Sequence, residues 1–146
     1  FDAASGAILP QYSIAISGGR ITAVAPTRGF RVPRGTRRID ARGKTVIPGM
    51  WDMHTHVFAS SPAGQSLRDL AMGVTGVRDL AADTDAATSL RDRSNALQIV
   101  APHLVLGGIM EGPQRWYGPT DVIVSTEDEA RAAVARYAEL GYRQVK

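Results

Sequence analysis

Residues 12–25 alternate hydrophobic side chains with polar or small ones on both sides of the pair Gly18-Gly19. A period of two is typical of a β-strand with one buried face, and a Gly-Gly pair supplies the positive φ angles that a two-residue hairpin turn needs. The pattern therefore predicts a β-hairpin. A basic loop follows, and residues 38–41 are predicted to form a further short strand. A β-unit as small as residues 1–47 has little core of its own.

Downstream of this unit the hydrophobic pattern switches repeatedly between strand and helix periods. Strands are predicted at residues 46–56, 74–79, 103–109 and 142–146. Helices are predicted at residues 66–72, 85–97 and 126–140, the last opened by the capping-box pattern Thr-Glu-Asp-Glu. Gly73 is predicted to be the left-handed cap of the first of these helices, and Gly141 is predicted to end the last one. Such alternation of strands and helices is typical of a parallel α/β fold.

Alternation alone fits both a (β/α)8 barrel and a doubly wound sheet. No predicted strand is followed by the Gly-x-Gly-x-x-Gly turn of a dinucleotide site. His54 and His56 stand at the end of the first of these strands, and barrels hold their catalytic groups at the carboxyl ends of strands. A barrel is therefore favoured. Because a complete barrel takes about 250 residues and this chain has 146, only part of one is expected.

The pair His54 and His56 is the strongest candidate for chemistry. Side chains on a strand repeat with period two, so the two imidazoles are expected to share a face, and Asp52 is expected to share it with them. Imidazoles spaced in this way can converge on one cation. The chain has no cysteine, so any metal site must use histidine, carboxylate or a modified side chain. An isolated His-x-His is also compatible with two polar residues whose hydrogen bonds are satisfied locally.

The composition is that of a globular chain, with 44% hydrophobic and 21% charged residues. No apolar run approaches the roughly 20 residues of a membrane span, so no membrane partner is expected. Residue 1 is Phe rather than Met, which leaves processing or truncation open, and the sequence assigns no compartment. Six arginines fall between residues 28 and 42, which would suit an arginine-rich binding module. Because no nucleic-acid motif or aromatic stacking residue accompanies them, a solvated surface is favoured and no nucleic-acid partner is expected.

The passage Pro-Gly-x-x-Asp-x-His-x-His at residues 48–56 resembles the signature of the amidohydrolase superfamily. The preceding Ile-Asp-x-x-Gly-x-x-x-x-Pro-Gly passage is similar to the segment that leads into that signature. Members are metal-dependent hydrolases built on a (β/α)8 barrel. The resemblance implies an α/β fold, namely the first half of a (β/α)8 TIM barrel over residues 48–146, preceded by part of a small N-terminal β-sandwich over residues 1–47. The chain is thus expected to be an N-terminal fragment.

Lys146 ends a Gly-x-x-x-x-Lys passage that is similar to one in the imidazolonepropionase-like and Xaa-Pro-dipeptidase-like branches of the superfamily. There the passage carries a carboxylated lysine on the fourth barrel strand. A neutral lysine amine that captures carbon dioxide becomes a carbamate whose two oxygens can bridge two cations, and desolvation favours the neutral amine. The resemblance implies that His54, His56 and Lys146 bind one or two divalent ions, zinc above all, and that Asp52 is a hydrogen-bond acceptor that orients the site. A lysine at a solvent-facing strand end is the alternative.

Four further residues are candidates for the substrate side. Arg78 and Asp79 end a segment that resembles the family's Gly-Val-Thr-Thr-x-Arg-Asp, with Gly76 in place of the second threonine. They follow the second barrel strand, where they face either substrate or each other as a local ion pair. Trp116 and Tyr117 lie in a long βα loop that is either a substrate-selecting lid or a packed surface excursion.

The resemblance implies a metal-dependent hydrolase of amide or cyclic amide C–N bonds, with a dipeptidase among the candidates and a small-molecule amide or dipeptide as substrate. The metal would polarise the carbonyl and activate water. In the family two further histidines and a proton-transferring aspartate lie on later strands, so no catalytic proton-transfer residue is expected here and the isolated 146-residue chain is expected to be inactive. The alternatives are a catalytically inactive amidohydrolase homologue and the arginine-rich binding module. A homo-oligomer is compatible with the sequence.

Overall fold

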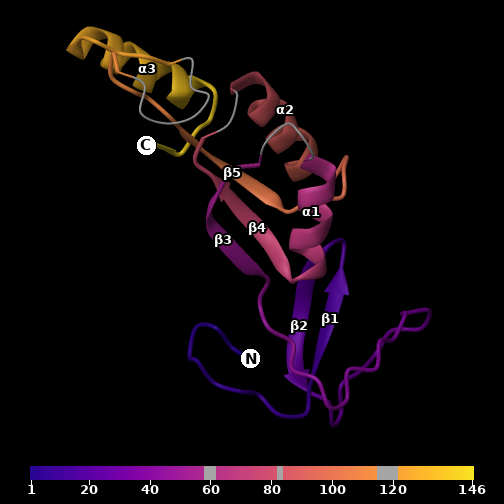
Figure 1. Cartoon of the computed structure of the whole chain (residues 1–146). Coiled ribbons are helices and arrows are strands. Elements are labelled where there is room, and N and C mark those ends of the chain that lie inside the picture. Colours follow the sequence, from indigo (N-terminus) through magenta and orange to yellow (C-terminus); the bar gives the residue numbers. More distant parts are fainter. Residues whose placement is uncertain (58–61, 82–83, 115–121) are drawn as a thin grey trace. The chain divides into compact units, whose positions relative to one another are not determined.

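The computed structural model describes residues 1–57, 62–81, 84–114 and 122–146 (Figure 1). The chain folds into two compact units, Phe1–Pro48 and Gly49–Lys146. Its elements in chain order are β1 (Tyr12–Ser17), β2 (Arg20–Pro26), β3 (Met50–Thr55), α1 (Pro62–Ala71), β4 (Val74–Asp79), α2 (Thr84–Asn95), β5 (His103–Gly108), α3 (Glu127–Glu139) and β6 (Gln144–Val145). No helix within these described ranges is long and apolar enough to cross a membrane.

The first unit is built on the predicted hairpin, which the structure confirms. β1 pairs antiparallel with β2, and the turn residues Gly18 and Gly19 have φ angles of 57° and 72°. Residues with a Cβ rarely adopt such angles at two successive positions, which explains the Gly-Gly pair. The strand predicted at residues 38–41 is not formed. There the Asp40 carboxylate accepts hydrogen bonds from the backbone N–H of Arg42 at 3.0 Å and from its guanidinium at 2.6 Å, a local turn that competes with strand pairing.

The second unit is built on a four-stranded parallel sheet in which the spatial order follows the chain order, β3-β4-β5-β6. One helix stands between each pair of successive strands, and α1 packs beside β4 while α2 packs beside β5 (Figure 1). A doubly wound sheet reverses its strand order at a switch point, whereas a barrel adds each strand next to the previous one. The predicted fold class, an α/β chain with the first half of a (β/α)8 barrel, is confirmed.

The core lies between this sheet and its helices. Val77 of β4 and Leu104 and Leu106 of β5 are 2%, 3% and 1% exposed, and Ala87 of α2 and Tyr137 of α3 pack in the same cluster. Because strand side chains alternate, the residues between these core positions point to the opposite face of the sheet. That opposite face is the one that would line the interior of a barrel.

The helix ends follow the predicted signals. Thr126 caps α3 through a capping box, in which its hydroxyl accepts the backbone N–H of Glu129 at 3.2 Å and the Glu129 carboxylate accepts the backbone N–H of Thr126 at 3.2 Å. Gly73 has a φ angle of 84°, which confirms the left-handed cap, and Gly141 after α3 has a similar φ angle of 77°. α1 begins at Pro62, four residues before the predicted start at Ser66.

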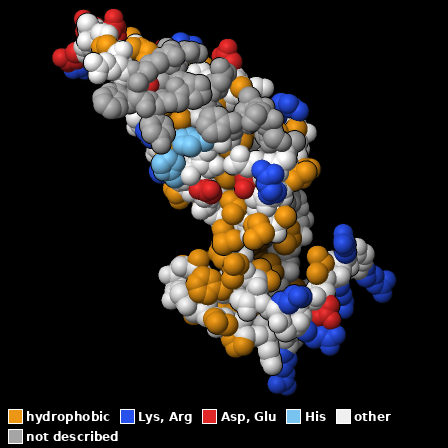
Figure 2. Space-filling view, in the orientation of Figure 1, with side chains coloured by type: hydrophobic (Ala, Val, Ile, Leu, Met, Phe, Trp, Pro, Cys, Tyr) orange, Lys and Arg blue, Asp and Glu red, His pale blue; other side chains and the backbone are white. Residues whose placement is uncertain are grey.

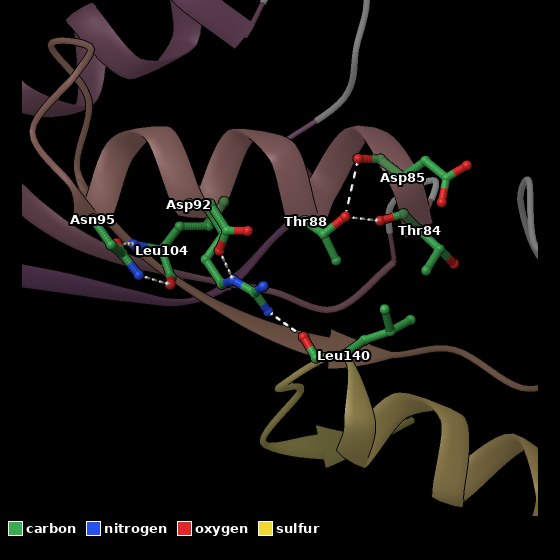
Figure 3. A network of polar contacts seen from close by, with 8 residues as sticks. Thr84, Asp85, Thr88, Asp92, Asn95, Leu104 and Leu140 are labelled. Carbon is green, nitrogen blue, oxygen red and sulfur yellow. Dashed lines mark hydrogen bonds and ion pairs between the residues drawn. The ribbon is translucent and has the colours of Figure 1, made fainter.

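Polar contacts from α2 fix two neighbouring elements (Figure 3). The Asn95 side chain accepts the backbone N–H of Leu104 at 3.0 Å and donates to the Leu104 carbonyl at 3.1 Å, which ties the helix end to β5. The Arg91 guanidinium donates to the carbonyl of Leu140 at 2.6 Å. Leu140 is the C-cap of α3, immediately before the Gly141 turn that leads into β6. Through these bonds α2 anchors both β5 and the approach to β6.

Tyr142 gives this core a pH dependence. Its side chain is 9% exposed, and burial raises its pKa from 10.0 to about 12. The folded state therefore holds the phenol proton more tightly than the unfolded chain does. The stability that this provides is complete below pH ~10 and is lost as the pH rises toward the folded pKa.

The Tyr142→Phe variant should consequently lose less free energy of unfolding than the wild type above pH ~10, by on the order of 1–2 kcal/mol. Urea denaturation at a series of alkaline pH values measures the difference. Tyr12→Phe is the matched control, because Tyr12 is 40% exposed, and it should follow the wild type. Equal losses of unfolding free energy at alkaline pH in the wild type and in Tyr142→Phe would contradict the raised pKa of Tyr142.

Candidate metal centre

A bulge in β3 includes the first residue of the histidine pair. β3 and β4 pair at Asp52 with Val77 and at Thr55 with Asp79, so Met53 and His54 lie opposite the single residue 78. Two residues facing one is the definition of a β-bulge, which bends a strand and re-aims its side chains. The bulge breaks the regular alternation of side chains between Asp52 and His54. A period of two therefore does not by itself place these two side chains on the same face of the sheet.

His54, within the bulge, and His56, beyond it, lie on the face of the sheet opposite the core. Thr55 and Val57 are buried, at 7% and 6% exposure, whereas His54 is exposed and His56 is half-buried between them. The two imidazole rings have centroids 5.3 Å apart and meet edge to face at 80°. Histidine side chains are visible at the molecular surface in Figure 2. The pair is thus adjacent and accessible at the carboxyl end of β3.

Lys146 meets this pair from the other edge of the sheet. Its Nζ lies 3.4 Å from His54 Nε2. β3 and β6 are the two outer strands of the sheet, and strands spaced about 4.8 Å apart would place them about 14 Å from each other if the sheet were flat. The contact shows that the sheet curls toward a barrel. The backbone of Lys146 is fixed in the ladder, since its N–H donates to the carbonyl of Gly108 at 2.7 Å and its carbonyl accepts the N–H of Met110 at 3.1 Å.

The three predicted ligand residues are therefore brought together, and they fit part of a metal site. Two imidazoles supply nitrogen donors of the kind that zinc and related ions take. An ammonium has no lone pair, so Lys146 could contribute only as a neutral amine or as its carbamate. Within the described residues no group of three or more His, Cys, Asp and Glu side chains could hold a metal ion.

Asp52 acts on the backbone of the first histidine. Its Oδ1 accepts the N–H of His54 at 3.0 Å, a hydrogen bond that the bulge leaves available. The negative charge of Asp52 also reaches α1, where burial first and then this charge raise the pKa of Asp69. The predicted orienting acceptor therefore binds the main chain of His54.

Arg78 and Asp79 hold the main chain of β3. Arg78 Nε donates to the carbonyl of Met53 at 2.6 Å, and its Nη1 donates to Gln144 Oε1 at 3.2 Å. Asp79 is 1% exposed, and its two carboxylate oxygens accept the N–H groups of Val57 at 2.6 Å and Ala81 at 2.9 Å. Burial raises the pKa of Asp79 against the opposing effect of these two hydrogen bonds.

Asp79 thus lies on the buried side of the sheet, and its substrate-side role stays a prediction. Successive strand residues point to opposite faces, and the hydrogen bonds of Arg78 and Asp79 go to separate partners rather than to each other. Trp116 and Tyr117 lie outside the described residues. Sequence reasoning missed Gln144, although its spacing of two from Lys146 would have placed it on the same face.

Gly76 makes room for an aromatic ring. In the sheet it pairs with Trp51 on one side and with His103 on the other. A Cβ at residue 76 would lie 2.3–2.6 Å from indole carbons of Trp51, whose ring meets that of His103 edge to face with centroids 5.8 Å apart. The glycine that replaces the usual threonine is therefore matched to Trp51.

A family model described as the amidohydrolase family matches residues 37–139. This is well over half of the chain, and it includes β3, β4, β5, the histidine pair and the helices α1, α2 and α3. The chain belongs to the amidohydrolase family.

Individual relatives agree with this assignment. The crystal structure of a protein from Bifidobacterium longum that carries a provisional assignment as a prolidase has a TM-score of 0.86 and 33% identity, over 97% of this chain and 36% of that chain. An imidazolonepropionase of Paenarthrobacter aurescens (strain TC1) is 28% identical over 134 residues, which are 91% of this chain and 32% of that protein. Adenine deaminase 3 of Rhizobium meliloti (strain 1021) is 45% identical over 53 residues, which are 36% of this chain and 9% of that protein. The chain thus spans about a third of the length of the first two relatives.

A threonine at residue 76 should clash with the ring of Trp51 on the neighbouring strand. We expect Gly76→Thr to lower the free energy of unfolding by about 1–3 kcal/mol, and the double variant Trp51→Ala/Gly76→Thr to recover part of the loss. Thermal or urea unfolding measures both. Gly112→Thr is the control, since a Cβ there meets nothing within 4 Å; equal costs at residues 76 and 112 would contradict the match between Gly76 and Trp51.

Proposed function

We propose that the whole protein is a metal-dependent hydrolase of amide or cyclic amide C–N bonds. The observation that carries this proposal is the 3.4 Å distance between Lys146 Nζ and His54 Nε2, with the centroid of the His56 ring 5.3 Å from that of His54. These side chains come from the carboxyl ends of the first and fourth strands of a parallel sheet, which is the end where barrel enzymes build their active sites.

His54 and His56 would hold a divalent ion, and zinc suits their nitrogen donors. Lys146, if carboxylated, would add carbamate oxygens next to the same histidines, and its two oxygens would allow one ion or two. When bound, a divalent ion supplies polarisation of a carbonyl and activation of water for hydrolysis. The chain's own residues contribute ligand placement: the α2 bonds fix the approach to β6, and the bulge aims His54 away from the core.

The substrate class that we favour is a small amide or dipeptide. The Bifidobacterium longum protein assigned provisionally as a prolidase matches 97% of this chain, and the imidazolonepropionase matches 91% of it. Membership of the amidohydrolase family and the enzymatic names of these relatives support hydrolysis of a C–N bond. A dipeptide with a C-terminal proline is the first substrate to test.

The test uses the whole protein, purified without chelator. We expect elemental analysis to find at least about one equivalent of zinc or a similar divalent ion, and we expect a panel of proline dipeptides, N-acyl amino acids, imidazolonepropionate and adenine to include a substrate whose hydrolysis a chelator abolishes. His54→Asn should lower kcat/KM by at least about 100-fold.

His103→Asn is the matched control, because His103 opens β5 at the opposite end of the strands and contacts Trp51. It should keep activity within a few fold of wild type. Activity that survives both metal removal and the His54→Asn substitution would contradict the proposal. A finding that the whole protein binds no divalent ion would also contradict it. The isolated 146-residue chain should show no turnover, since its described residues supply only part of a ligand set.

A further inference from the structure

We infer that Arg78 and Asp79 are positioning residues that clamp the His54–His56 segment by binding its main chain on both sides. Arg78 binds the carbonyl of Met53, directly before His54, at 2.6 Å. Asp79 binds the N–H of Val57, directly after His56, at 2.6 Å. That this clamp serves a metal site rests on the proposed function, whereas the clamp itself rests on these contacts.

The bulge explains why β3 needs such a clamp. Where two residues of one strand face a single residue of its neighbour, the regular ladder is broken and main-chain groups are left to find other partners. Arg78 is the residue opposite the bulge, and its guanidinium takes the Met53 carbonyl. The other group released there, the N–H of His54, is taken by Asp52. Side chains thus replace the ladder around His54.

The two halves of the clamp act from opposite faces of β4. Successive strand residues point to opposite sides, so Asp79 reaches β3 from the buried side and Arg78 from the side that carries the histidines. Asp79 is 1% exposed, and both of its oxygens are occupied by main-chain N–H groups. This carboxylate fixes the path of residues 55–57, because breaking its bond to Val57 would leave a buried N–H group without a hydrogen-bond acceptor.

Arg78 also links the two strands that bring the ligands. Its Nη1 donates to Gln144 of β6 at 3.2 Å, two residues before Lys146. One guanidinium therefore joins the main chain beside His54 to the strand that ends in Lys146. The planar fork of arginine can serve two acceptors in fixed directions, which the single point charge of lysine cannot.

The test uses the whole protein, with the variants Asp79→Asn, Arg78→Lys and the gentler Gln144→Leu. Asp128→Asn and Arg143→Lys are matched controls, because Asp128 is an exposed carboxylate on α3 and Arg143 is exposed before β6. The readouts are zinc affinity by competition with a chromogenic chelator, the visible spectrum of the Co²⁺-loaded protein, and hydrogen exchange of residues 53–57 in the metal-free protein.

We expect Asp79→Asn and Arg78→Lys to weaken zinc binding by about 10–100-fold, to alter the Co²⁺ spectrum and to speed exchange at residues 53–57, with a smaller effect of Gln144→Leu and none in the controls. Folded variants that keep wild-type zinc affinity and the wild-type Co²⁺ spectrum would overturn the metal-positioning role. If the wild type binds no zinc, the proposed function fails instead, and the exchange data alone decide whether the clamp exists: unchanged exchange in Asp79→Asn and Arg78→Lys would overturn it.

Discussion

The curl of one parallel sheet is the constraint on which the candidate site depends. His54 and Lys146 stand on the two outer strands, and only a sheet bent toward a barrel lets their side chains approach to 3.4 Å. The bend is supported from the core side, where Val77, Leu104 and Leu106 are packed against helices. The same packing commits one face of the sheet to structure and leaves the other face to chemistry.

Hydrogen bonds then fix the main chain on both sides of the candidate site. On the β6 side, Arg91 of α2 holds the carbonyl of Leu140 before the turn that leads to Lys146. On the β3 side, Asp52, Arg78 and Asp79 take main-chain groups on either side of the two histidines. Arg78 joins the two sides through Gln144.

Much of this architecture was predictable because its causes are local. The Gly18-Gly19 turn, the capping box at Thr126 and the glycine caps each depend on a few neighbouring residues, and the structure forms all of them. The alternation of strands and helices, together with a histidine pair at a strand end, was enough to predict the half-barrel. These features follow from backbone preference and hydrophobic period, which a single sequence carries.

The parts that sequence reasoning missed depend on a partner strand. The bulge in β3 is a property of its register with β4, and period two cannot reveal it. The hydrogen bond between Asp79 and the N–H of Val57 could not be predicted, because these two residues are brought together only by the pairing of β3 with β4. The strand predicted at residues 38–41 had a suitable pattern, yet Asp40 and Arg42 form a local turn there. The presence of glycine rather than threonine at residue 76 is likewise explained only by the Trp51 ring on the neighbouring strand.

Whether the histidine pair and Lys146 form one metal centre is best tested by a crystal structure of the whole protein measured at the absorption edge of its metal. We expect an anomalous peak about 2.0–2.2 Å from nitrogens of both His54 and His56, with density for a carbamate on Lys146 beside it. A metal peak located elsewhere in the barrel, with His54 and His56 uncoordinated, would contradict it.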